Sequence, residues 1–133
     1  MKKNIFLQLS LMFYGVSLVL PVFIKPNESF WNIEGYGFIF LFCGWMTYGE
    51  SWVDFLCWFS NIFIFLSWIF YRKKWRIYLS WLGILPMFLY GIDYFIQLQL
   101  FEIMYYKAIL VGYFFWLGSA IFLLFPFSKG IEN

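Results

Sequence analysis

Apolar residues follow one another along this chain in long runs, with few of the polar interruptions that mark an amphipathic helix or a half-buried strand. Four runs stand out, at residues 5–24, 52–71, 77–98 and 108–127. A helix of about 20 residues is about 30 Å long, which matches the hydrocarbon core of a bilayer. We therefore predict an all-α, polytopic transmembrane helical bundle of four spans, forming a single domain over residues 1–133.

A fifth apolar stretch, at residues 36–48, is harder to place. It has 13 residues and is flanked by Gly35 and Gly49. Runs of this length are more typical of re-entrant or interfacial segments than of spans. If the stretch does not cross the bilayer, there are four spans and both termini lie on one side. If it does cross, there are five spans.

The basic residues favour the four-span arrangement. Lys and Arg in short loops stay on the cytoplasmic side of a membrane. With four spans, seven of the 9 basic residues share the side of both termini, whereas with five spans the better orientation divides them six to three. The seven are Lys2, Lys3, Arg72, Lys73, Lys74, Arg76 and Lys129. We expect a protein of the plasma membrane, such as a bacterial inner membrane, with both termini cytoplasmic.

Composition supports lipid as the main solvent and excludes several kinds of site. Charged residues make up 12% of the chain, against about 25% in soluble proteins, so they are too few for a polar shell. The net charge of +2 is too small to indicate a nucleic-acid partner. The chain has no His, which removes His-ligated haem, most zinc sites and Ser-His pairs. We expect no cofactor and no catalytic activity.

The two cysteines, Cys43 and Cys57, do not form a CxxC motif. A disulfide between them is possible in an oxidising compartment. Cysteine also serves as a small apolar residue in segments of this kind, and we expect two reduced thiols.

Polar residues within the runs are the candidate functional residues. Asp93 lies about 24 Å along the third long run, counted from residue 77, with Tyr90 and Gln97 on the same helix face. Asp54 has a similar depth on the second run, and Asn61 lies further in. Ionisable groups within spans mark ion or substrate paths, so this set predicts an outward-facing polar vestibule. The simpler interpretation, which we favour, is that both aspartates reach the headgroup region and are hydrated.

Small residues recur along the last run, at Ala108, Gly112 and Ser119. In lipid, small side chains let helix backbones approach closely, because van der Waals contact replaces the hydrophobic effect there. We predict a helix-packing face, either within the bundle or between copies of the chain.

Two functions fit these features. The first is a non-enzymatic protein that binds another membrane component, as an accessory subunit or an immunity-type protein. Its partners would be the lipid bilayer and a membrane protein or further copies of itself. The alternative is a small oligomeric transporter or channel, with Asp93 in the outward-facing vestibule.

Overall fold

The computed structural model describes residues 4–22, 35–49, 52–100 and 106–125. Within these ranges the chain is helical, and its only β-pairing is an isolated antiparallel bridge between Pro21 and Tyr36. The elements are α1 (Ile5–Val19), α2 (Gly37–Cys43), the 3-10 helix η2 (Gly44–Thr47), α3 (Trp52–Ile69), α4 (Trp75–Leu100) and α5 (Tyr106–Phe122). The predicted all-α class is confirmed.

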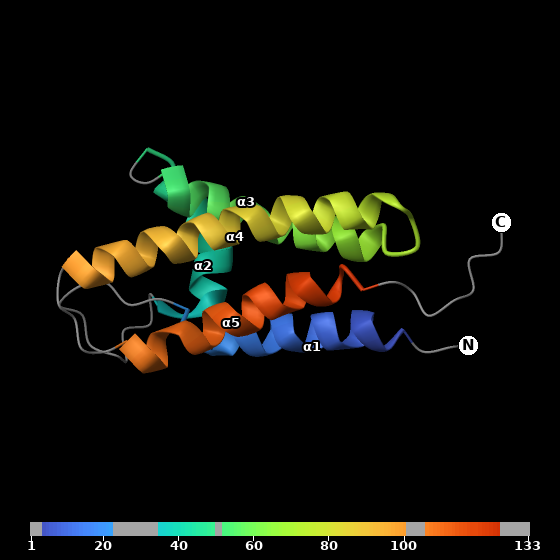
Figure 1. The fold of residues 1–133 in the computed structure, drawn as a ribbon, viewed down its shortest axis with the longest axis horizontal. Coiled ribbons are helices and arrows are strands. Elements are labelled where there is room, and N and C mark those ends of the chain that lie inside the picture. The colour runs from blue at the N-terminus through green and yellow to red at the C-terminus, as the bar shows by residue number, and fades with distance from the viewer. Residues whose placement is uncertain (1–3, 23–34, 50–51, 101–105, 126–133) are drawn as a thin grey trace.

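The four long helices form two antiparallel pairs, as Figure 1 shows. One pair is α3 with α4, joined directly by the turn at residues 70–74. The other pair is α1 with α5, which come from opposite ends of the chain. α1 begins and α5 ends at the same end of the molecule as the α3–α4 turn. We call this the basic end, after Arg72, Lys73, Lys74 and Arg76.

The predicted re-entrant stretch, residues 36–48, contains a short helix that lies across the others. In Figure 1, α2 runs from the α1–α5 pair towards the α3–α4 pair. Its 7 residues reach only about 10 Å. A Cβ on Gly37 would lie 2.2 Å from the carbonyl oxygen of Ser17, so only glycine fits where α2 meets α1. This segment therefore does not run alongside the four long helices.

Helix length and apolar composition together support one membrane span. Within the described ranges, α3 is the only helix that is both long enough and apolar enough to cross a bilayer, while α1 and residues 111–122 are apolar but shorter. The first predicted span extended to residue 24, but α1 ends at Val19 and Leu20 is extended. Leu20 precedes Pro21, and the residue before a proline is biased away from the helical conformation. The four-span bundle thus remains a prediction.

Candidate functional site

Asn61 of α3 lies where the two helix pairs meet. Its side chain is 3% exposed. Its Oδ1 accepts hydrogen bonds from the hydroxyl of Tyr14 in α1, at 2.8 Å, and from Nε1 of Trp116 in α5, at 2.9 Å. The side-chain Nδ2 donates to the carbonyl of Trp58, at 3.1 Å. One amide therefore joins three helices, and both lone pairs of its oxygen are used.

A second set of hydrogen bonds joins the same helices nearer the basic end. Trp68 of α3 donates through Nε1 to the hydroxyl of Ser10 in α1, at 2.9 Å. Ser10 in turn donates to the carbonyl of Ser119 in α5, at 2.7 Å. This short chain of donors fixes both members of the α1–α5 pair against α3.

The contact between α4 and α5 depends on a tyrosine and a glycine. The Tyr113 hydroxyl donates to the carbonyl of Met87, at 2.7 Å. A Cβ on Gly91 would lie 2.5 Å from the Tyr113 hydroxyl oxygen, so a side chain at this position would displace the phenol. Tyr113, Met87 and Gly91 are all buried. The tyrosine therefore reaches α4 because Gly91 leaves it room.

The structure divides the residues of the predicted vestibule between two environments. Asn61 and Tyr90 belong to the packed centre, where the Tyr90 ring lies 6.1 Å from that of Phe40 and 6.2 Å from that of Tyr113. Asp54 and Asp93 are only partly buried. The side chain of Gln97 lies outside the described residues. Among the described side chains, Asn61 and Tyr90 are thus more deeply buried than the two aspartates, and a common vestibule of the five residues remains a prediction.

The register of α3 against α4 brings the two aspartates to the same level. The hydroxyl of Ser80 lies 3.3 Å from that of Ser67, and a Cβ on Gly83 would lie 3.7 Å from Ile64. Both pairs follow one antiparallel register. Continued away from the basic end, this register sets Asp54 opposite Asp93.

The small residues of α5 face α1 of the same chain. The amide of Gly112 donates to the carbonyl of Pro21, at 3.1 Å. The backbone carbonyl of Ser119 accepts the hydrogen bond from Ser10. The side chain of Ala108 lies outside the described residues. In this part of the chain the small residues of α5 therefore pack within the bundle. Their spacing alone was equally compatible with packing between copies of the chain.

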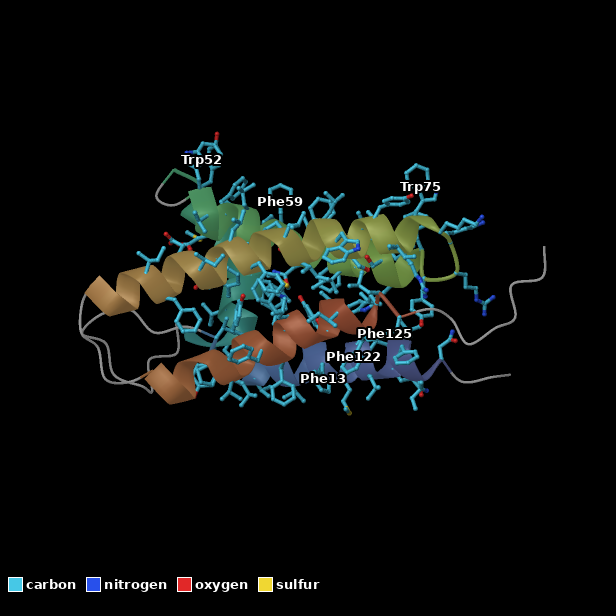
Figure 2. All side chains as sticks on the ribbon, in the orientation of Figure 1. Phe13, Trp52, Phe59, Trp75, Phe122 and Phe125 are labelled. Carbon is cyan, nitrogen blue, oxygen red and sulfur yellow. The ribbon has the colours of Figure 1, made fainter. Side chains whose placement is uncertain are left out.

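The described part of the chain has an apolar outer surface, and its interior combines a hydrophobic cluster with small polar side chains. Among the described residues, seven uncharged polar side chains are buried, namely Ser10, Ser17, Ser60, Asn61, Ser67, Ser80 and Ser119. The outward positions of α4 are apolar, and they include Trp81, Leu82, Leu85, Phe88, Leu89 and Ile92. The other helices also carry exposed apolar side chains, such as Met12 of α1 and Trp52 of α3, the latter pointing away from the bundle in Figure 2. Soluble monomers rarely expose a continuous apolar surface of this extent.

Exposed Trp and Tyr side chains gather at both ends of the α3–α4 pair. Trp75 and Tyr78 lie at the basic end, while Trp45, Tyr48 and Trp52 lie at the opposite end. Figure 2 shows Trp52 and Trp75 at the two ends of this pair. The 18 residues of α3 correspond to about 27 Å. Two aromatic bands at this separation are typical of the two interfaces of a bilayer.

An apolar groove of about 400 Å³ lies beside the start of α3. It is lined by Trp45, Met46, Tyr48 and Phe55. The Tyr48 ring is edge-on to that of Phe55, with 5.0 Å between centroids. Sequence reasoning missed this groove, because it forms only where η2 folds back on α3. Cys43 and Cys57, on the neighbouring turns of α2 and α3, are both free thiols.

No protein-family model, curated protein or solved structure matches this chain, so its function must be inferred from its own residues.

Proposed function

We propose that the chain is an integral membrane protein in which α1, α3, α4 and α5 cross the bilayer and α2 does not. The apolar outer surface carries this proposal, since large apolar side chains face outwards while the buried serines and Asn61 lie beside the hydrophobic cluster inside. Helices α1 and α5, of 15 and 17 residues, are slightly short for the hydrocarbon core. Local thinning of the bilayer accommodates such a mismatch at fractions of a kcal/mol per Å.

The same proposal places the basic end at the cytoplasmic face. α1 begins and α5 ends beside the basic α3–α4 turn, and the stacked rings of Phe6 and Phe125, with centroids 5.2 Å apart, hold these two ends together. Basic loops remain cytoplasmic. The membrane location is tested by washing membranes at alkaline pH and centrifuging them without detergent. The protein should stay in the pellet, and its release as a folded species into the supernatant would overturn the proposal.

For the activity, we propose that the protein binds a transmembrane helix of another membrane protein in the groove of Trp45, Met46, Tyr48 and Phe55. A surface that contacts only fluid acyl chains needs no preformed groove. Here a groove is present, and in the proposed orientation it lies near the membrane interface. Aromatic residues and Met are enriched at the centre of protein interfaces, and the flexible Met46 can adapt to a partner. Such a protein would serve as an accessory or immunity-type subunit, without catalysis.

Site-specific photo-cross-linking in cells tests this activity. A photoreactive phenylalanine replaces Tyr48 at the groove, and a matched control replaces Leu85, which is exposed on the outer face of α4. The proposal expects a discrete protein adduct from position 48 that position 85 does not give. A doubled chain mass would identify a second copy as the occupant instead. Lipid adducts alone at both positions would refute the activity.

A small transporter or channel is the second candidate, and the register that sets Asp54 opposite Asp93 favours it. Two carboxyl groups at one level of a bundle could bind a cation or a proton on its way across. The variant Asp93→Asn should then abolish a flux measured in proteoliposomes. Equal flux through wild type, variant and empty vesicles would eliminate this candidate.

A further inference from the structure

Arg76 is the one buried charged side chain in the described part of the chain. It is the second residue of α4 and is 6% exposed. Its Cζ lies 4.8 Å from the centroid of the Tyr71 ring, which stacks beneath the guanidinium. Its Nη1 has no hydrogen-bond partner among the residues that the structure describes. A buried charged donor left unpaired is costly, so its presence points to a missing partner.

The described carboxyl groups cannot supply this partner. Asp93 is 17 residues further along α4, or about 25 Å along the helix axis, and Asp54 lies level with it. The described side chains nearest to Arg76 in sequence add positive charge instead, because Arg72, Lys73 and Lys74 are exposed in the same turn. The basic end therefore concentrates cations around a buried guanidinium, and this positive charge favours an anion as the partner.

The backbone here also favours an anion. The amides of Arg76 and Ile77 make only long bonds to the carbonyls of Lys73 and Lys74, at 3.3 and 3.4 Å. These amides belong to the first turn of a helix of 26 residues. The N-terminus of such a helix carries a partial positive charge, which favours an anion nearby.

We propose that Arg76 is the buried cation of a phosphate-binding site at the basic end, and that the phosphate belongs to an anionic lipid headgroup. A guanidinium donates charge-assisted hydrogen bonds to phosphate oxygens, and the unpaired Nη1 group is available as such a donor. The lipid source rests on the proposed membrane location, which puts this turn at headgroup level. The three exposed cations of the turn attract anionic headgroups towards it.

The test uses the full-length protein in dodecyl maltoside, a detergent without phosphate. Phosphatidylglycerol, inorganic phosphate or oleate is added, and the thermal midpoint of unfolding gives the half-saturating concentration. Oleate carries a charge without a phosphate. For Arg76→Gln, the half-saturating concentration of phosphatidylglycerol should rise about tenfold or more. The matched control Arg72→Gln removes an exposed charge, and should weaken phosphatidylglycerol and oleate alike, by no more than about fivefold.

The outcomes distinguish a lipid phosphate from a free phosphate ion, and both of these from the absence of a phosphate site. Stabilisation by phosphatidylglycerol alone, lost in Arg76→Gln, supports the lipid source. Stabilisation by inorganic phosphate, lost in the same variant, supports the site with a free ion. Equal half-saturating concentrations of phosphatidylglycerol and oleate for the wild type would overturn the phosphate site, and this result holds even if Arg76→Gln does not fold. Arg76→Lys, which keeps the charge, should retain part of the preference. Failure here leaves the membrane location intact, because the centrifugation assay tests that separately.

Discussion

The two helix pairs are packed side by side but are held together by different means. α3 and α4 are consecutive in the chain, and the short turn at residues 70–74 makes them antiparallel neighbours. α1 and α5 are separated by the whole α2–α4 region, so no turn holds them together. Their contact depends on side chains and backbone groups along its length, from Phe6 against Phe125 at the basic end to Gly112 against Pro21 at the other.

This difference indicates where the bundle is sensitive. A pair closed by a short turn has a small entropy of closure to overcome and tolerates imperfect contacts. A pair formed from distant segments must gain its stability from the fit of its surfaces. The bonds of Asn61 to Tyr14 and Trp116 add to that fit by tying α1 and α5 to α3. Changes in the α1–α5 pair should therefore cost more than equivalent changes in the α3–α4 pair.

The largest contrast is expected from the same substitution, Gly to Ala, made in each pair. A Cβ on Gly112 would lie 2.5 Å from the carbonyl oxygen of Pro21 and 2.9 Å from that of Leu20, and both are backbone atoms that cannot rotate away. Gly112→Ala should lower the free energy of unfolding by about 3 kcal/mol. The measurement is SDS-induced unfolding in mixed micelles, followed by tryptophan fluorescence.

The matched variant is Gly83→Ala in the α3–α4 pair. A Cβ there meets Phe63 and the carbonyl of Ser60 at 3.5 Å, which is ordinary contact. This variant should be neutral, or stabilising by up to about 1 kcal/mol through helix propensity. Similar losses in both variants would show that the two pairs depend equally on close packing, contrary to the comparison above.

The second prediction concerns the junction between the pairs. Asn61→Ala removes the acceptor for both the Tyr14 hydroxyl and the Trp116 Nε1 group, leaving two buried donors unpaired. Hydrogen bonds between helices in a membrane are weaker than their burial suggests, so we expect a loss of about 2 kcal/mol. The adjacent Ser60 is a matched control, because its buried hydroxyl has no hydrogen-bond partner within the described ranges. Ser60→Ala should cost nothing measurable, and equal losses would assign the effect to helix packing in general.

The sequence predicts the parts of this fold that depend on local pattern. The long runs gave the helices, and the short basic connection at Arg72 to Arg76 made α3 and α4 neighbours. The sequence also indicated a re-entrant or interfacial segment at residues 36–48, with a fifth span as the alternative. The sequence could not identify the helix that packs against the small residues around Gly112. Residue spacing shows that a helix face consists of small residues, but it does not show which segment lies against that face. For a related reason, the sequence could not show which groups Asn61 bonds to.

The role of Asn61 depends on its bonding partners. A polar residue in an apolar run is compatible with water or with a buried bond, and only the approach of Tyr14 and Trp116 decides between them. These partners lie 47 and 55 residues away in the chain. Arg76 is a similar case, since the sequence assigned it to an orienting basic loop, while its burial against Tyr71 appears only in three dimensions.

A third prediction compares one serine from each pair. Ser10→Ala removes the bond to the Ser119 carbonyl and leaves Nε1 of Trp68 without its acceptor, so it should lower the free energy of unfolding by about 1 kcal/mol. Ser80→Ala removes a hydroxyl that bonds mainly to the Arg76 carbonyl of its own helix, at 2.8 Å. Its loss should be smaller than about 0.5 kcal/mol. The same unfolding assay measures both losses. A larger loss for Ser80→Ala than for Ser10→Ala would contradict the expectation that the α1–α5 pair is the more sensitive one.

The smallest expected effect is at the contact between the two pairs on the α4–α5 side. Tyr113→Phe removes the hydroxyl bond to the Met87 carbonyl, and should cost about 0.6 kcal/mol, the average for such bonds in a membrane bundle. The same hydroxyl is the atom that a Cβ on Gly91 would meet at 2.5 Å. Gly91→Ala should therefore be destabilising alone and less so when combined with Tyr113→Phe. A double-mutant cycle measures this coupling directly. If the two losses of unfolding free energy are strictly additive, the need for glycine at position 91 does not come from Tyr113. The two helix pairs would then be in contact here without energetic coupling.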